Sequence, residues 1–115
     1  HFYSVAQDDV LKNVSAAMKA GSSKELVKFF HNVVEVNIDG ERSNYSRAQA
    51  EVVVKDFFQK NPPTDFEYIH EGASKEGLSY TIGKLTIKEG EYRVVMFVKK
   101  IGGVFAVDTF NLTRE

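Results

Sequence analysis

The chain has 115 residues, 43% of them hydrophobic, so it can bury one core and is predicted to fold as a single domain over residues 1–115. Its 15 Lys and Arg against 16 Asp and Glu give a net charge of −1. This balance argues against a nucleic acid partner, because a protein that binds phosphates needs a basic excess. The absence of Cys excludes thiol catalysis, disulfides and Cys-ligated zinc.

Two features of the sequence bear on where the protein works. No apolar run is long enough for a transmembrane helix, so no integral membrane segment is predicted. The sequence begins at His1 rather than Met, which fits a precursor that has lost its signal peptide. We therefore expect an exported protein, either periplasmic or at the cell surface.

The first third of the chain predicts two helices and a strand. Residues 8–21 begin with two acidic residues, carry apolar side chains at helical spacing and end in Gly, a common helix stop. A second, shorter helix starts at Ser22. Residues 33–38 then alternate as a strand, and Asp39-Gly40 follows as a turn.

A third helix is predicted from Ser46 to the Pro62-Pro63 pair. Ser46 and Gln49 have the spacing of a capping box, and consecutive prolines cannot continue a helix. The buried stripe of this helix is predicted to contain Ala50, Val53, Val54, Phe57 and Phe58.

The second half of the chain predicts a meander of strands, and one of them changes phase. In residues 78–87 the apolar side chains occupy even positions as far as Ile82 and odd positions from Leu85 onward. A slip of one residue reverses the faces of a strand unless a β-bulge absorbs it. We therefore predict a bulge near Gly83 that bends the sheet.

Residues 92–98 form a strand that is apolar on both faces. One face can meet the helices, and the other needs a second molecule or a flanking element. This pattern predicts a homodimer through the sheet. The order of elements favours an α+β fold with three helices packed on a strongly bent antiparallel sheet of four to six strands.

Several residues also carry a family resemblance: Tyr45-Ser46, Gln49-Ala50-Glu51, Phe57-Phe58, Asn61-Pro62, Phe66, His70, Gly72, Tyr80, Ile82-Gly83 and Tyr92-Arg93-Val94. They resemble a bacterial domain-of-unknown-function family of small exported proteins, similar in fold to the nuclear transport factor 2-like (cystatin-like, α+β cone) superfamily. The resemblance implies a cone whose mouth holds a small molecule, with an outer sheet face that pairs in homodimers. It brings no established activity.

Two side chains are candidates for acid–base catalysis. His70 shares a predicted strand face with Phe66 and Tyr68, and an imidazole in a pocket can act as a general base. The alternative is a solvated His, or one bonded to nearby backbone. Asp108 falls among the apolar positions of the last strand, where it can face inward. The alternatives are a carboxylate at the rim that pairs with Lys or Arg, and a second phase slip that turns it outward. Together the two residues would form a dyad for proton transfer next to a carbonyl.

The residues expected to line a ligand pocket are Tyr68, His70, Tyr80, Tyr92, Met96 and Phe57. Tyr hydroxyls can orient a ligand in an apolar cavity, although ordinary sheet packing is the alternative for each of them. The three histidines form no metal-binding motif, so neither a metal nor a cofactor is expected.

Three functions fit these patterns. The leading hypothesis is a non-enzymatic module that binds an apolar small molecule or a protein segment in the cone. The second is a small isomerase- or dehydratase-like enzyme that uses His70 and Asp108. The third is an interaction domain whose cone is filled by Phe57, Phe58 and Met96. An open pocket with His70 and Asp108 in contact would support the enzyme, whereas a filled cone with both outside it would support the interaction domain.

Overall fold

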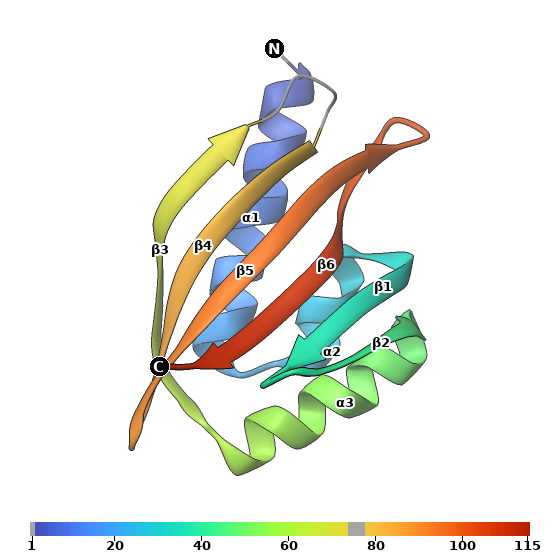
Figure 1. Cartoon of the computed structure of the whole chain (residues 1–115). Helices are drawn as coiled ribbons and strands as arrows, with labels where there is room; N and C mark the ends of the chain where they lie inside the picture. Colours follow the sequence, from blue (N-terminus) through green and yellow to red (C-terminus); the bar gives the residue numbers. More distant parts are fainter. Residues whose placement is uncertain (1, 74–77) are drawn as a thin grey trace.

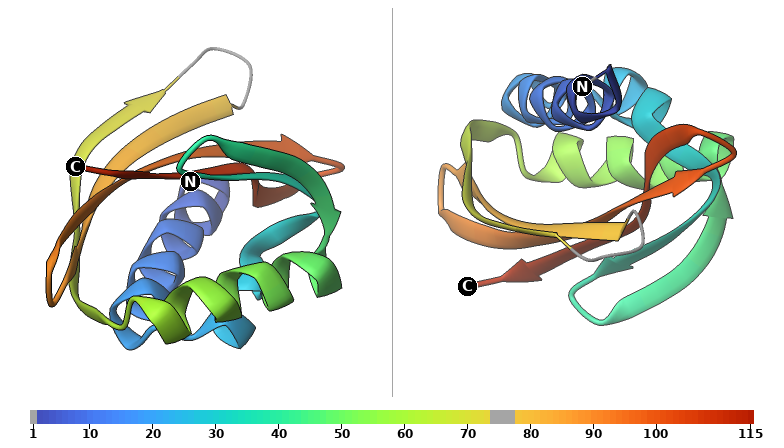
Figure 2. Two further views of the ribbon diagram at one scale, coloured as in Figure 1. Left: turned by 60° about the horizontal axis from the view of Figure 1, so that its bottom comes forward. Right: turned by 90° about the horizontal axis from the view of Figure 1, so that it is seen from above.

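The structure is a computed structural model that describes residues 2–73 and 78–115, with the side chains of residues 8–72 and 79–115. Three helices lie on the concave side of one six-stranded sheet, which curls around them (Figures 1 and 2). The elements in chain order are α1 (Phe2–Ala20), α2 (Ser23–Leu26), a 3₁₀ helix η1 (Val27–Phe29), β1 (Phe30–Ile38), β2 (Glu41–Ser46), α3 (Arg47–Lys60), β3 (Pro63–Ala73), β4 (Leu78–Ile87), β5 (Gly90–Ile101) and β6 (Val104–Arg114).

The predicted fold class is confirmed, with one correction to the sheet. The strand order is β2-β1-β6-β5-β4-β3, and the β1–β6 pairing is parallel, so the sheet is mixed rather than wholly antiparallel. The parallel pair arises because α3 carries the chain from β2 to the far edge at β3. The meander then returns across the sheet and places β6 beside β1.

Helix α3 follows the sequence prediction closely. The Ser46 hydroxyl accepts a hydrogen bond from the Gln49 amide, and the Gln49 side chain accepts one from the Ser46 amide. The predicted stripe faces the core, with Val53 partly buried. Helix α1 ends as predicted at Gly21, which has a φ of +65°. It begins at Phe2 rather than near residue 8, because the preceding residues contain no Gly or Pro to stop a helix.

Strand β2 was not predicted from the sequence. Its residues, ERSNYS, are mostly exposed and lack an apolar alternation, because β2 is an edge strand. It forms through the predicted Asp39-Gly40 turn, where both residues have positive φ values, +52° and +92°. Two consecutive left-handed residues match the twist of a tight hairpin, so the turn dictates the pairing of β1 with β2.

The predicted bulge lies on β3, not on β4. Strand β4 pairs with β5 in unbroken register, and its odd-numbered residues face the helices along its described length. On β3, Tyr68 lies opposite Gly83 and His70 lies opposite Ile82, so Ile69 is an extra residue. The phase prediction for β4 was therefore wrong: Tyr80 and Ile82 are apolar residues on the outer face of the sheet.

A second bulge lies on β6. Phe97 of β5 pairs with Thr109, whereas the next residue, Val98, pairs with Val107, which leaves Asp108 as the extra residue. Consequently the side chains buried in the core change parity at the bulge. Val107, before the bulge, has an odd number, whereas Phe110, after it, has an even number. The phase slip considered for this strand is confirmed. Bulges of this kind increase the local bend and twist of a sheet.

Side chains fill the concave interior between the sheet and the helices. Phe30 and Phe110 are in ring contact at a centroid distance of 5.4 Å, and Phe57 meets Tyr92 edge to face at 4.9 Å. The core includes Val14, Met18, Leu26, Val34, Val36, Val54, Phe58, Phe66, Leu85, Val94, Met96, Val98 and Leu112. The interior is thus occupied by the protein's own aromatic and aliphatic groups.

Gly83 provides space for this arrangement, and a substitution tests it. A Cβ atom at Gly83 would lie 2.5 Å from Phe66 Cζ and 3.2 Å from the Glu67 carbonyl oxygen. We expect Gly83→Ala to lower the free energy of unfolding, measured with urea, by about 1–3 kcal/mol, because overfilled cores are strained. In a Phe66→Leu background the same change should cost less, since the shorter side chain leaves room. An unchanged stability in Gly83→Ala would contradict this account.

Candidate functional site

The bulge at Ile69 turns His70 out of the cone. His70 is exposed on the outer face, where Nε2 lies 3.2 Å from the Tyr80 hydroxyl oxygen. The sequence had placed His70 on the same face as Phe66 and Tyr68. That prediction was wrong because the extra residue lies between Tyr68 and His70 and reverses the faces after it.

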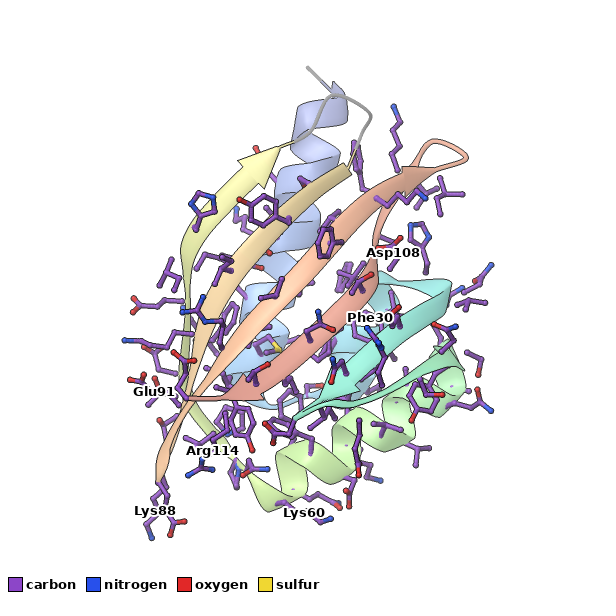
Figure 3. All side chains as sticks on the ribbon, in the orientation of Figure 1. Phe30, Lys60, Lys88, Glu91, Asp108 and Arg114 are labelled. Carbon is purple, nitrogen blue, oxygen red and sulfur yellow. The ribbon has the colours of Figure 1, made fainter. Side chains whose placement is uncertain are left out.

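Asp108 does not meet His70. It lies on β6 (Figure 3), in the bulge of that strand. Its Oδ1 accepts a hydrogen bond from the Thr109 hydroxyl at 3.3 Å. Strands β4 and β5 separate β6 from β3. Three strand spacings of about 4.8 Å separate the two residues by at least roughly 14 Å across the sheet, and Asp108 is also offset along β6 from Asn111, which lies in line with His70. The predicted dyad is therefore not assembled.

Tyr80 also faces outward, where it belongs to an aromatic and apolar surface. Its ring contacts those of His70 and Phe97 at centroid distances of 5.4 and 6.2 Å. The tyrosine ring also covers Gly72, its partner on β3, where an added Cβ would lie 2.5 Å from Tyr80 Cε1. Strand pairing places Ile82 and Val95 beside these rings. We name the surface formed by His70, Tyr80, Ile82, Val95 and Phe97 the outer patch.

Three other predicted ligand-binding residues, Phe57, Tyr92 and Met96, are buried in the core rather than arranged around an opening. The Tyr92 hydroxyl donates to Asp39 Oδ2 at 3.3 Å. The Arg114 amide donates to Asp39 Oδ1 at 2.8 Å. These bonds join the β1–β2 turn to β5 and β6, so Tyr92 has a structural role.

Tyr68 remains on the inner face, at the edge of a groove between α1 and β3. The groove has a volume of about 470 Å³ and contains both acidic and basic side chains, among them Asp8, Lys12, Lys19 and Glu71. The Tyr68 hydroxyl donates to the Leu11 carbonyl oxygen of α1 at 2.7 Å. Burial, with a smaller contribution from the Glu71 carboxylate, raises the pKa of Tyr68 far above its usual value. Tyr68 is therefore a neutral anchor that holds α1 to the sheet.

A larger groove opens where β1 and β6 separate. Phe30 pairs with Val107, but the next pair is Glu35 with Thr109, so residues 31–34 have no partners on β6. We name this opening the hairpin groove, because one wall is the β5–β6 hairpin. Its volume is about 680 Å³, and it is lined by Asp9, Val10, Lys28, Phe29, Phe30, His31, Asn32, Arg47, Ile101, Gly103, Val104, Phe105 and Ala106.

Polar contacts hold the walls of the hairpin groove in place. His31 Nε2 lies 2.9 Å from the Lys99 carbonyl oxygen. Because a carbonyl only accepts, Nε2 carries the hydrogen and donates it. Arg47 donates from Nη2 to Asn32 Oδ1, which joins the start of α3 to β1. The Lys100 ammonium lies 5.5 Å from the centre of the Phe105 ring.

The hairpin groove was not predicted from the sequence. Its walls come from four separate segments, and only the fold brings them together. One local signal was present, because Arg47 is the first residue of α3 and a cation is unfavourable at the positive end of a helix. The described side chains contain no cluster of three His, Asp or Glu that could hold a metal ion. No helix in the described part of the chain is long and apolar enough to cross a membrane.

Comparison with known proteins assigns a family. A family model described as "Domain of unknown function (DUF4783)" matches residues 11–112. The chain belongs to the DUF4783 family. A DUF4783 family protein from Bacteroides ovatus ATCC 8483 is 29% identical and superposes with a TM-score of 0.84, covering 90% of this chain and 93% of that one. A search of curated proteins finds no match.

More distant structures share the fold of this DUF4783 protein. An NTF2-like protein of unknown function from Shewanella baltica OS155 has a TM-score of 0.74 at 11% identity, covering 97% of this chain and 93% of that one. A domain of unknown function with a cystatin-like fold from Nostoc punctiforme PCC 73102 has a TM-score of 0.75 at 12% identity, covering 97% and 76%. Both the family and the cone fold suggested by the sequence are thus confirmed.

The Tyr68 anchor predicts a specific dependence of stability on pH. A raised pKa means that the stability contributed by the neutral hydroxyl is complete below the ordinary tyrosine value of about 10 and is lost at higher pH. We expect Tyr68→Phe to lower the free energy of unfolding by about 1 kcal/mol at neutral pH.

Urea unfolding at pH 8 and pH 11 provides the measurement. The loss of stability between these two pH values should be smaller in Tyr68→Phe than in the unmodified protein. Tyr80→Phe is the control, because Tyr80 is exposed on the outer face. If Tyr68→Phe and Tyr80→Phe lose the same stability on alkalinisation, Tyr68 is not the buried anchor described above.

Proposed function

We propose that this protein is an exported, non-catalytic binding module whose ligand site is the hairpin groove. One contrast carries the proposal: the interior of the cone is filled by side chains, whereas an apolar-walled groove opens beside it. Clefts of this size and composition commonly bind small molecules. The ligand therefore lies at the mouth of the cone, outside the core.

The exposed apolar side chains of the β5–β6 hairpin support a binding role. Ile101 is 51% exposed and Val104 is 61% exposed, and both line the hairpin groove. Phe29 and Phe105 are partly buried beside them, against the edge of the core. A ligand that covers these groups removes apolar surface from water, at about 25 cal/mol per Å².

The enzyme hypothesis depended on a His70–Asp108 dyad, and two strands separate these residues. The filled cone favours the interaction hypothesis over a ligand inside the cone. The proposal combines the two: a binding module, as in the leading hypothesis, whose site lies outside the filled cone. The predicted residues Phe57, Tyr92 and Met96 pack in the core and do not line a pocket.

We also propose that a second copy of the chain covers the outer patch. The patch is a row of three rings with two aliphatic neighbours, and Tyr80 is 39% exposed. The charges beside it are of both signs: Lys84 pairs with Glu67 and Glu91, Arg93 pairs with Glu115, and Lys99 is exposed next to Phe97. An approaching copy thus meets mixed charges rather than a field of one sign, which favours self-association.

Binding in the hairpin groove can be tested with a neutral apolar probe, N-phenyl-1-naphthylamine, whose fluorescence rises in apolar surroundings. We expect saturable binding that Val104→Asp weakens about tenfold, because a carboxylate disfavours an adjacent apolar ligand. Val52→Asp is the matched control, since Val52 is 68% exposed on α3 and does not line the groove. Equal binding by both variants would place the probe elsewhere and contradict the proposal.

The homodimer is tested by light scattering. We expect a mass of twice the 13.0 kDa chain, and we expect Phe97→Asp to yield monomers because it puts a charge in the centre of the outer patch. Val52→Asp again serves as the control, because it places the same charge on α3. A monomeric unmodified protein at high concentration, or a Phe97→Asp variant that stays dimeric, would rule out this interface.

A further inference from the structure

We infer that the hairpin groove takes an alkyl chain ending in a carboxylate, with the Arg47 guanidinium contacting the carboxylate. The inference rests on the proposed function, because it uses the same groove and adds a ligand class. It depends on two features: the apolar wall of the groove and the cations that line it.

Among the described lining residues of the groove, Lys28 and Arg47 carry positive charge and Asp9, on α1, carries negative charge. Lys28 is already paired with Glu25 at 2.9 Å. The complementary ligand is therefore anionic, and Arg47 is the lining cation best placed to receive its charge.

Arg47 retains most of its binding capacity. A guanidinium has five N–H donors, and within the described part of the chain Arg47 uses one of them, in the bond from Nη2 to Asn32 Oδ1. Among the described side chains no carboxylate forms an ion pair with Arg47, whereas Arg42 and Arg93 each pair with a glutamate. Asn32 holds the guanidinium at the groove without neutralising it. A guanidinium with free N–H donors and no paired carboxylate can bind a ligand carboxylate through two parallel hydrogen bonds.

The wall of the groove favours an alkyl chain. His31 is bonded to the Lys99 carbonyl, and the Asn32 side-chain oxygen is bonded to Arg47. An alkyl chain needs no hydrogen-bond partner and matches the exposed Ile101 and Val104 on the hairpin. The ligand is accordingly a free fatty-acid-like molecule.

The test compares decanoate with decan-1-ol, which share an alkyl chain and differ in charge. Amide NMR titrations at pH 8 report both the affinity and the location of each ligand. We expect both molecules to shift the amide resonances of residues 28–32 and 101–106. Decanoate should bind about fivefold more tightly than decan-1-ol, because one exposed ion pair contributes up to about 1 kcal/mol. High salt should reduce this difference, because exposed charges are screened.

Variants at the start and middle of α3 assign the effect. Arg47→Gln should bind decanoate and decan-1-ol with equal affinity, and Arg47→Lys should keep a preference for decanoate. Lys55→Gln is the control, because Lys55 is an exposed cation on the same helix that does not line the groove. Thermal melting of each variant shows that the fold is retained.

The outcomes separate this inference from the proposed function. Equal affinities for decanoate and decan-1-ol in the unmodified protein overturn the carboxylate inference but leave an apolar groove. A decanoate preference that survives in Arg47→Gln overturns the role of Arg47. If neither molecule shifts the groove amides, the proposed function fails together with the inference.

Discussion

The bulge at Ile69 sets the orientation of the side chains at the end of β3. Before it, Phe66 and Tyr68 point inward, one into the space above Gly83 and the other toward α1. After it, the alternation is reversed and His70 joins Tyr80 on the outside. A single inserted residue therefore places an imidazole on the surface that strict alternation would place in the interior.

With the imidazole outside, the interior can be filled by packing groups alone. Phe57, Tyr92 and Met96 occupy the space in which a ligand had been expected. Surfaces available for binding are consequently found outside the core: the hairpin groove at the mouth of the cone, and the outer patch on the convex side. The second bulge, at Asp108, lies where β6 parts from β1, so the bulges at Ile69 and Asp108 each border a proposed binding surface.

Local signals in the sequence predicted the elements well, whereas the faces of two strands depended on tertiary pairing. Ser46, Gln49 and the two prolines fixed the limits of α3, because capping and chain termination are local effects. The bulge on β3 left no trace, since Phe66, Tyr68 and His70 alternate perfectly. The change of parity in the sequence of β4 was interpreted as a bulge in that strand. It arises instead because Tyr80 and Ile82 are apolar residues on the outer face. Alternation alone does not distinguish apolar residues on the outer face of a sheet from apolar residues in the core.

The central claim is that Ile69 is the extra residue, and nuclear Overhauser contacts across β3 and β4 test it directly. The account predicts backbone contacts from Tyr68 to Gly83 and from His70 to Ile82, with the Tyr68 ring close to Leu11 of α1. It also predicts contacts between the His70 and Tyr80 rings. Backbone contacts between Ile69 and Ile82, together with a His70 ring close to α1, would contradict it.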